Sequence, residues 1–391
     1  HHQKLLLAQH FAPFQLLVSK RAREIYLVKI FVYPFLMTIV FWMSGCSVGS
    51  KKLPDNFAGL DWPNQFGGGN TNAPAGAGWL ADFNDRTLDA LVREALSNNP
   101  DLRITAAKLE AAQASVKIAG ANLLPAISAR AASSRTKRNS TSGFKVTSLR
   151  TYRHTPSLDL AWELDVWERL SDTRRAARLD AEQAAINLQG ARLSLAANTA
   201  KGWFNLAETE LQTQLAQQTL KSYTNNLAVL EEGLQRGLTK VLDVRLMQTS
   251  VRNAENTLQL RLRQQDAAGR SLEVLLGRYP KREVAATAKL PSLTNNVPAG
   301  LPAQLIERRP DVLAAQRGYL ASHYRVGSAK KDRLPKISLT ANYGTSSDEL
   351  KDVLDINNNI WNLATNLTMP IFDAGKIKSQ IKSAEALREQ A

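Results

Sequence analysis

Two stretches of the chain decide its fold: "PDLRITAAKLEAAQASVKIAGANLLPAIS" at residues 100–128 and "PDVLAAQRGYLASHYRVGSAKKDRLPKIS" at residues 310–338. They align without a gap at an offset of 210 residues, and both begin with Pro-Asp and end with Leu-Pro-x-Ile-Ser. Chance supplies a few shared alanines, but not two prolines and a common ending in register. The 391-residue chain therefore contains an internal tandem repeat, and one structural unit must occur twice.

The hydrophobic period changes after the shared Leu-Pro of each repeat. Before the proline the pattern is helical, whereas after it apolar and polar residues alternate, and a second alternating run follows a polar loop. Period two with one apolar face predicts strands, and segments of about ten residues suit tilted membrane strands. The predicted strands lie at about 126–139, 152–164, 336–345 and 360–369. The pattern alone leaves open a soluble hairpin packed on a helix.

Polar side chains occupy the second face of these strands, opposite Leu and Trp. In a membrane barrel such a face lines water, so these residues are predicted to face a pore. They are Asp159, Glu163, Asn342 and Asn366. The alternative for the two carboxylates is acid–base chemistry, but pore-wall charges are the preferred interpretation on a water-lined face.

A long helix is predicted between the two pairs of strands. Residues 166–235 contain no proline, and apolar residues from Tyr223 to Leu234 recur at spacings of four, three and four. The pattern indicates a helix of about 70 residues, or about 100 Å. A compact globule of this chain length needs no such rod.

The chain turns back at Gly237, which can take the left-handed conformation that ends a helix. A returning helix is predicted at about 240–276, where "LLGRYP" stops it. This helix is too short to match the rod, and a helix at about 98–124 supplies the missing length. Two shorter helices are therefore expected to lie end to end against the long one.

Four strands cannot close a membrane barrel, because such barrels have at least about eight strands. Open strand edges in lipid would leave backbone groups without hydrogen bonds, so several chains must contribute strands. Three chains and about twelve strands form the simplest symmetric solution. The expected fold class is mainly α with membrane β: a long antiparallel α-helical barrel, continued by a transmembrane β-barrel that three protomers share.

The N-terminal part resembles an export signal. Residues 30–43 carry no charge and follow a basic segment, which is typical of the apolar core of a secretory signal. Cys46, the only cysteine, follows Met-Ser-Gly, as in a bacterial lipobox. We predict an upstream extension and lipoprotein signal at 1–45, acylated Cys46, and an extended lipid-anchored tether at 46–78. The alternative is a short buried helix that ends at a free thiol.

The formal charge of +15 does not indicate nucleic acid as a partner, because the basic residues form no DNA-binding module. Several lie in the signal, and seven lie between Ala126 and Ser157, where no acidic residue occurs. In an exported protein, outer-membrane lipid and lipopolysaccharide phosphates are the expected neighbours of such a loop. A solvated loop is the alternative.

Catalytic and metal-binding motifs are missing from the sequence. Outside the N-terminal segment the only histidines are His154 and His323, and neither accompanies paired cysteines or a phosphate-binding glycine loop. We therefore expect no enzyme activity, cofactor or metal.

Six motifs and segments carry a family resemblance: "LLPAIS", "LLGRYP", Trp79–Leu102, "WELDVW" at 162–167, "GLTKVLDV" at 237–244 and "LTMPIFDAGKI" at 367–377. The most specific stretch is "LPAQLIERRPDV", within residues 300–316. The chain resembles the TolC-like outer-membrane efflux proteins, in particular the NodT/OprM-like lipoprotein branch that works with resistance-nodulation-division pumps. The resemblance covers nearly everything after the tether.

The resemblance implies a homotrimer in the outer membrane that extends into the periplasm. It would act as the passive export duct of a tripartite pump for small molecules, together with a periplasmic membrane-fusion adaptor and an inner-membrane RND transporter. The residues implied for adaptor docking are Arg236, Gly237, Leu242 and Asp243. The alternative role of the two charged residues is ordinary helix-end capping.

Two other functions stay open: the outer-membrane duct of a type I protein secretion system, and a lipid-anchored periplasmic coiled-coil adaptor or scaffold. The first efflux repeat is expected at 79–291 and the second, incomplete, at 300–391. Because the second repeat stops soon after its strands, we expect the aperture-closing helices of the family to lie in a missing C-terminal part. Glu168 and Ala374 replace glycines usual in the family, and the strand-to-helix bend at Glu168 is expected to differ.

Overall fold

The computed structural model describes residues 79–142, 145–286, 290–291 and 308–391. The chain divides into two compact units, His1–Trp62 and Pro63–Ala391. The predicted signal, Cys46 and the predicted tether all lie outside the described residues. Every described residue belongs to the second unit.

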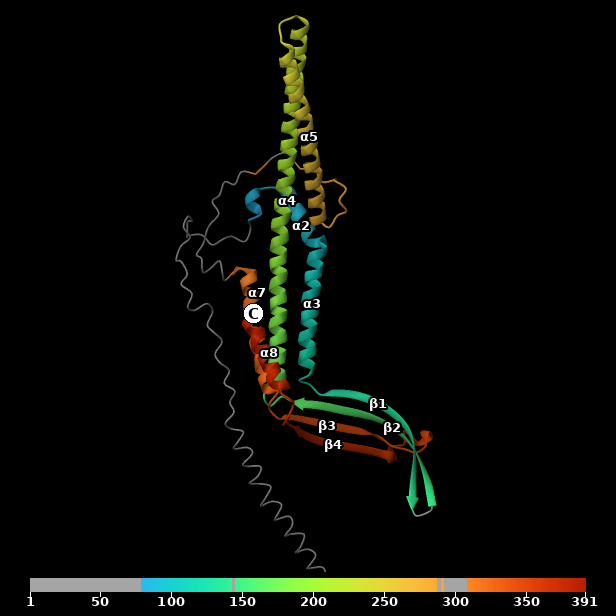
Figure 1. Ribbon diagram of the computed structural model, residues 1–391. Coiled ribbons are helices and arrows are strands. Elements are labelled where there is room, and N and C mark those ends of the chain that lie inside the picture. Colours follow the sequence, from blue (N-terminus) through green and yellow to red (C-terminus); the bar gives the residue numbers. More distant parts are fainter. Residues whose placement is uncertain (1–78, 143–144, 287–289, 292–307) are drawn as a thin grey trace, which may run out of the picture. The chain divides into compact units, whose positions relative to one another are not determined.

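Helices dominate the described part, and the longest is α4 (Arg169–Gln235), which packs against most of the others (Figure 1). Helix α5 (Val241–Leu275) returns along one half of α4, and α3 (Pro100–Ala121) lies along the other half. The further helices are α2 (Arg86–Asn98), α7 (Pro310–Lys331), α8 (Lys376–Gln390) and the short 3-10 helices η1 (Ala81–Phe83), η2 (Leu350–Asp352) and η3 (Ile356–Asn358). Among the described residues, no helix is both long enough and apolar enough to cross a bilayer.

The prediction of two shorter helices end to end is confirmed, and Asn99 joins them. Its side-chain oxygen accepts hydrogen bonds from the backbone N–H groups of Asp101 (2.9 Å) and Leu102 (3.1 Å), which caps α3. Its amide group donates to the carbonyl oxygen of Leu275, at the end of α5 (2.9 Å). Gly277 follows with φ of +75°, and a Cβ there would lie 2.6 Å from the Asn98 carbonyl oxygen. Only glycine therefore fits this contact.

The hydrophobic core lies where α2, α4 and α5 meet. Leu88, Leu206 and Leu272 are completely buried there, and Trp203 packs beside them. The indole N–H of Trp203 donates to one carboxylate oxygen of Asp85 (2.8 Å), and the other oxygen of Asp85 caps α2. The core thus fixes the middle of the rod, while much of α4 and α5 beyond it stays exposed.

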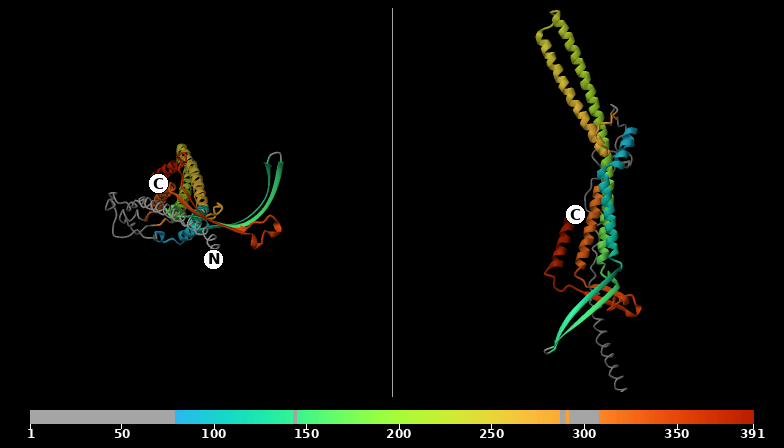
Figure 2. Two further views of the ribbon diagram at one scale, coloured as in Figure 1. Left: turned by 90° about the horizontal axis from the view of Figure 1, so that it is seen from below. Right: turned by 90° about the vertical axis from the view of Figure 1, so that its right-hand side faces the viewer.

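The four strands form one antiparallel sheet in the order β1-β2-β3-β4. They are β1 (Ala126–Ser142), β2 (Lys145–Leu164), β3 (Lys336–Thr345) and β4 (Asn359–Thr368). The register aligns Leu158, Tyr343 and Trp361 in one row across β2, β3 and β4. Apolar side chains of this face are open in the single chain: Ile127 is 71% exposed and Trp361 73%. Figure 2 shows β1 and β2 bent together into an arc.

The first hairpin is longer than predicted. β2 begins at Lys145, not at about 152, and β1 continues to Ser142, not to about 139. The ladder runs residue by residue to the pair of Ser142 and Lys145, so backbone hydrogen bonds carry the strands beyond the region of apolar alternation. The alternation of apolar and polar residues therefore predicted only the part of the hairpin that has an apolar face.

Glu273 on α5 holds the segment that comes after the helix. Its almost fully buried carboxylate accepts hydrogen bonds from the backbone N–H groups of Arg282 (2.7 Å), Glu283 (2.5 Å) and Val284 (3.1 Å). Burial raises the pKa of Glu273, but these N–H groups favour the charged form more strongly, so the pKa lies below its ordinary value.

We expect Glu273→Gln to lower the free energy of unfolding by about 2 kcal/mol, because Gln replaces one of the two accepting oxygens with an NH2 group and leaves a buried N–H group without its acceptor. The Glu273 contribution is complete above the ordinary glutamate pKa of about 4.3 and is lost as the pH falls through the lower folded-state pKa. Thermal unfolding of the detergent-solubilised chain at several pH values checks both effects. The exposed neighbour supplies the control Glu283→Gln, and equal loss in the two variants would contradict the expectation.

Candidate functional site

The polar face of the sheet brings together two of the predicted pore residues. Asp159 on β2 stands opposite Asn342 on β3, and Asn342 stands opposite Asn362 on β4. The Asn342 amide donates to the Asp159 carboxylate, and the Ser157 hydroxyl donates to the same group at 3.3 Å. This row can line water, because its side chains are polar and its one carboxylate, that of Asp159, is held by two neutral donors.

Glu163 lies on the same face, in a row with Ser338 and Asn366. Its carboxylate accepts two hydrogen bonds from one Arg169 nitrogen, at 2.8 and 3.0 Å, and both side chains are partly buried. Arg169 is the first residue of α4. The carboxylate of Glu163 is therefore committed to an ion pair at the base of the sheet, a contact that strand alternation did not reveal.

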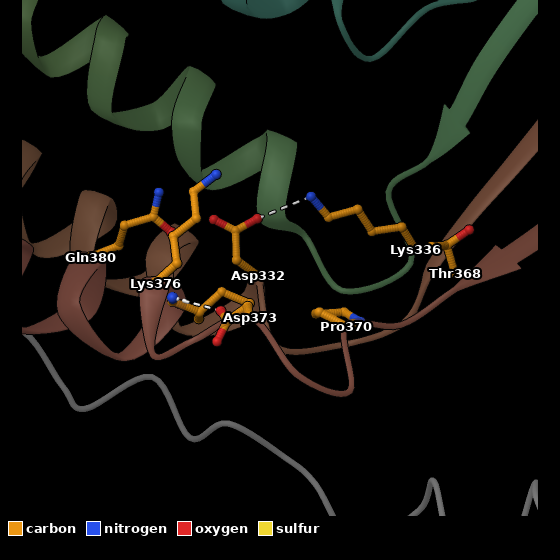
Figure 3. Close-up of a pocket in the computed structure, with 8 residues that line it drawn as sticks. Asp332, Lys336, Thr368, Pro370, Asp373, Lys376 and Gln380 are labelled. Carbon is orange, nitrogen blue, oxygen red and sulfur yellow. Dashed lines mark hydrogen bonds and ion pairs between the residues drawn. The ribbon is translucent and has the colours of Figure 1, made fainter.

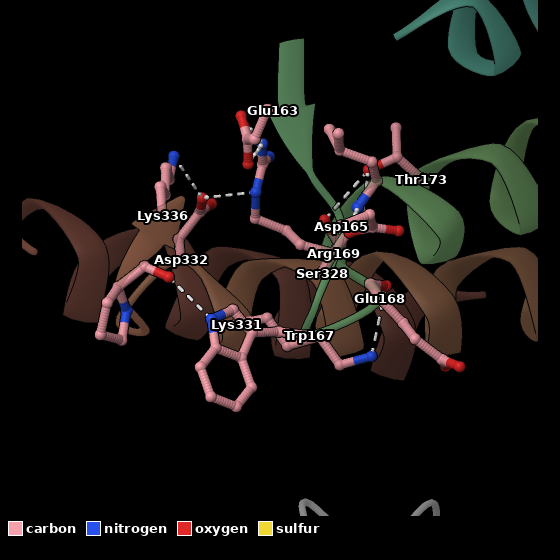
Figure 4. Close-up of polar contacts among 12 residues, drawn as sticks. Glu163, Asp165, Trp167, Glu168, Arg169, Thr173, Ser328, Lys331, Asp332 and Lys336 are labelled. Carbon is pink, nitrogen blue, oxygen red and sulfur yellow. Dashed lines mark hydrogen bonds and ion pairs between the residues drawn. The ribbon is translucent and has the colours of Figure 1, made fainter. Parts of the chain in front are cut away.

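The ion pairs continue from Arg169 into the second repeat (Figure 4). Arg169 Nε lies 3.7 Å from a carboxylate oxygen of Asp332, just after α7, and Lys336 Nζ at the start of β3 lies 3.2 Å from the same oxygen. The series Glu163–Arg169–Asp332–Lys336 alternates in sign and links β2, α4, α7 and β3. We call these four residues the junction network.

The bend between β2 and α4 is held by Asp165. Its two carboxylate oxygens accept from the backbone N–H groups of Leu170 (2.9 Å) and Ser171 (2.7 Å). Burial raises the pKa of Asp165, but hydrogen bonds from Ser171 and Leu170 outweigh it, so the pKa lies below its ordinary value. The Trp167 indole N–H donates to the Pro335 carbonyl oxygen (2.7 Å), which ties this bend to the other repeat.

The second repeat has an equivalent bend before α8. Asp373 accepts from the backbone N–H groups of Gly375 (3.0 Å) and Ile377 (2.8 Å), and the N–H of Ile377 lowers the pKa of this carboxyl. The residue immediately before each helix is left-handed: Glu168 has φ of +59° and Gly375 has φ of +83°. Glu168 therefore occupies a backbone conformation that favours glycine.

A buried ion pair joins the start of α4 to the end of α7. Asp172 is almost fully buried and accepts from Lys331 Nζ (2.6 Å) and from Arg175 (2.9 Å). A Cβ on Gly327 would lie 2.8 Å from an Asp172 oxygen, so the two helices approach closely at this point. The two repeats are thus held together by paired charge as well as by packing.

A hollow lies beside the junction network, where β3, β4 and α8 meet (Figure 3). Two aspartates and two lysines line it with neutral residues: Asp332, Lys336, Thr368, Pro370, Asp373, Lys376, Ile377 and Gln380. Asp332 is paired with Lys336, and Asp373 caps α8. Within the described ranges, no group of three or more His, Cys, Asp or Glu residues could hold a metal ion.

The tip of the helical hairpin carries the four residues implied for adaptor docking. Gly237 is left-handed with φ of +73°, and the N–H of Leu238 donates to the Gly233 carbonyl oxygen (2.8 Å) to close the turn. Arg236 is paired with Glu232 on its own helix, while Asp243 lies in the first turn of α5. Leu238 is 81% exposed, so the tip presents an apolar surface.

We expect Glu168→Gly to raise the free energy of unfolding by about 1 kcal/mol. Glycine removes a left-handed strain of about 1–2 kcal/mol, and the exposed pair of Glu168 with Arg175 (3.0 Å) contributes at most about 1 kcal/mol. The control is Glu168→Ala, which removes the ion pair without relieving the strain. In thermal unfolding of the purified chain, the Glu168→Gly variant should have a higher melting temperature than the wild type, and the wild type a melting temperature at or above that of Glu168→Ala. A Glu168→Gly variant that melts below Glu168→Ala would refute the expectation.

The comparisons with known proteins agree with this geometry. The family model "Outer membrane efflux protein" matches residues 91–278 and 301–391. Cation efflux system protein CusC of Escherichia coli is 28% identical over an aligned length of 366 residues, with 92% of this chain and 77% of CusC covered. The probable efflux pump outer membrane protein TtgC of Pseudomonas putida is 30% identical over 358 residues, with 88% of this chain and 73% of TtgC covered.

A solved structure shows the same fold. The outer-membrane channel OprN superposes with a TM-score of 0.78 at 25% identity, and the match covers 88% of this chain and 78% of OprN. Both the family model and the fold contradict the coiled-coil adaptor or scaffold alternative. The chain belongs to the outer membrane efflux protein family, whose members are efflux channels of the outer membrane.

Proposed function

We propose that three copies of this chain close one twelve-stranded barrel in the outer membrane, and that their helices form a tube into the periplasm. The assembly is a passive export duct for small molecules and catalyses no reaction. The observation that carries the proposal is the four-stranded sheet, which has one exposed apolar face and two unpaired edges, β1 and β4.

Backbone chemistry requires the closure. The edge strands present N–H and C=O groups that only another strand can satisfy in lipid, where no water is available. Four strands are too few to curl into their own barrel, and rotational symmetry joins β4 of one copy to β1 of the next. The apolar face, with Ile127 and Trp361, then meets lipid, and the row of Asp159 and Asn342 lines the lumen.

The tip supplies the docking surface for a periplasmic membrane-fusion adaptor, which connects the duct to an inner-membrane RND transporter. Its support is the exposed apolar group Leu238, Val241 and Leu242, placed at the end of the hairpin of α4 and α5. Arg236 is already paired with Glu232 on its own helix. We therefore assign most of the binding free energy of the adaptor to Leu238 and Leu242, and the electrostatic orientation of the adaptor to Asp243.

The N-terminal anchor is part of the same proposal. Cys46 would carry the acyl chains, and residues 46–78 would connect the anchor to the channel body. The barrel already holds the assembly in the bilayer, so the acylated cysteine serves as an address and a tether for the start of the chain.

Disulfide trapping tests the closure. In a Cys46→Ser background, Ala129→Cys on β1 is combined with one cysteine at a time on β4. The β4 positions on the apolar face are Trp361, Leu363, Thr365 and Leu367. Oxidation should produce covalent dimers and trimers at the one position opposite Ala129, because a disulfide needs Cα atoms within about 7 Å.

The control pair is Ala129→Cys with Ala364→Cys, which lies on the polar face and should not cross-link. Covalent species larger than trimers would show a different symmetry. A chain that migrates as a monomer from unheated outer-membrane extracts, and cross-links nowhere, would contradict the shared barrel.

Substitution at the tip tests the docking surface. Leu242→Asp places a charge on a side chain that is 64% exposed, and we expect binding of the purified trimer to the adaptor from the same genome to weaken about tenfold or more. Leu350→Asp in η2 is the matched control, because Leu350 is 69% exposed but lies beyond the sheet. An equal effect of the two variants on the measured Kd would exclude docking at the tip.

A further inference from the structure

The first hairpin carries cations on the same side as the lipid-facing residues. Side chains alternate along a strand, so Arg135 and Lys137 of β1 share the face of Ile127. The register places Arg135 opposite Tyr152 and Lys137 opposite Arg150. Arg135, Lys137 and Arg150, which we call the outward cations, therefore continue the apolar face beyond its last apolar row. All three are exposed.

Three other cations of the same hairpin lie on the opposite face. Arg130 and Arg138 of β1 lie on the side opposite to Arg135, and Arg153 of β2, which pairs with Ser134, shares that side. These three, the inward cations, belong to the face of Asp159 that lines the proposed lumen. The outward and the inward cations thus carry equal charge on one hairpin, and they differ in the face of the sheet on which they lie.

The outward cations have no carboxylate partner in the described part of the chain. Lys137 and Arg150 are directly opposite each other, and like charges in such a cross-strand pair repel. The Arg135 guanidinium lies 5.1 Å from the centre of the Tyr152 ring, which orients it without neutralising it. An external anion would relieve this repulsion.

The position along the strand indicates which anion is available. Tyr152 lies twelve positions before Leu164, the residue of β2 nearest the helices. At about 3.3 Å per residue, these twelve steps extend about 40 Å along the strand. At a strand tilt of about 40°, this length corresponds to a rise of about 30 Å along the barrel axis. The apolar band of an outer-membrane barrel is about 25 Å tall, so Arg135 and Tyr152 lie just beyond it, at the level of aromatic residues and lipid headgroups.

The hairpin end is also the end remote from the helices, because α3 precedes β1 and α4 follows β2 at the other end of the sheet (Figure 1). With the helices in the periplasm, as the proposed function requires, the outward cations face the outer leaflet. We propose that Arg135, Lys137 and Arg150 bind the phosphate groups of anionic lipid in the outer leaflet of the outer membrane, that is, of lipopolysaccharide.

The experiment measures binding of fluorescent lipopolysaccharide to the full-length chain in phosphatidylcholine nanodiscs. The outward variant is Arg135→Gln/Lys137→Gln/Arg150→Gln. We expect its Kd for lipopolysaccharide to rise about tenfold or more, because each cation near an anionic lipid surface adds to the attraction. Dephosphorylated lipopolysaccharide should bind the wild type and the variant equally weakly.

The matched control changes the same number of charges on the other face of the same hairpin, Arg130→Gln/Arg138→Gln/Arg153→Gln. It should keep the wild-type Kd. Equal weakening in the two triple variants would overturn the proposal, because it would show attraction by net charge alone, and an unchanged Kd in the outward variant would overturn it as well.

Trimer formation in neutral nanodiscs separates this inference from the proposed function on which it rests. If the wild type forms no trimer there, the shared barrel fails, whatever the lipopolysaccharide data show. If only the outward variant loses its trimer in neutral lipid, the partner of these cations is the acidic loop of a neighbouring copy, and the lipid proposal is wrong. That loop contains Asp348, Glu349, Asp352 and Asp355.

Discussion

The register at which the strands leave the helices is the constraint on which the rest of the structure depends. A shift of one residue would exchange the apolar and polar faces of a whole strand. Indole groups hold this register: Trp162 donates to the Leu123 carbonyl oxygen (3.0 Å) and Trp167 to that of Pro335 (2.7 Å). Each acceptor lies at the Leu-Pro step of one repeat, where the chain changes from helix to strand: Leu123 precedes Leu124-Pro125, and Pro335 belongs to Leu334-Pro335.

The junction network adds electrostatic order to the same layer. Its alternating charges run from Glu163 to Lys336 through residues of both repeats, and the buried pair of Asp172 with Lys331 lies next to it. Removing one partner of such a pair leaves a buried charge, which is costly, so the two repeats are held in one relative position. This rigid layer lets a curved sheet and a long helical rod belong to one folded unit.

Along the long helices, apolar packing contributes more than ion pairs to holding the elements together. Buried apolar side chains gather where α2, α4 and α5 meet, and Asn99 with Gly277 aligns α3 and α5 on either side of that point. Away from this core, α4 exposes apolar side chains such as Leu215 and Val229. A rod with so much exposed apolar surface is consistent with helices that pack against further copies, as the proposed tube requires.

The sequence by itself determined the repeat, the four strands and the long helical hairpin, because period and punctuation are local properties: Leu-Pro ends a helix, and Gly237 permits a left-handed turn. It also placed Asp159 and Asn342 on one face, since alternation sets the side of a strand. Only the tertiary structure decided the length of the first hairpin and the ion pair of Glu163 with Arg169. Those features depend on backbone ladders and on side chains from different elements, and hydrophobic periodicity carries no information about either.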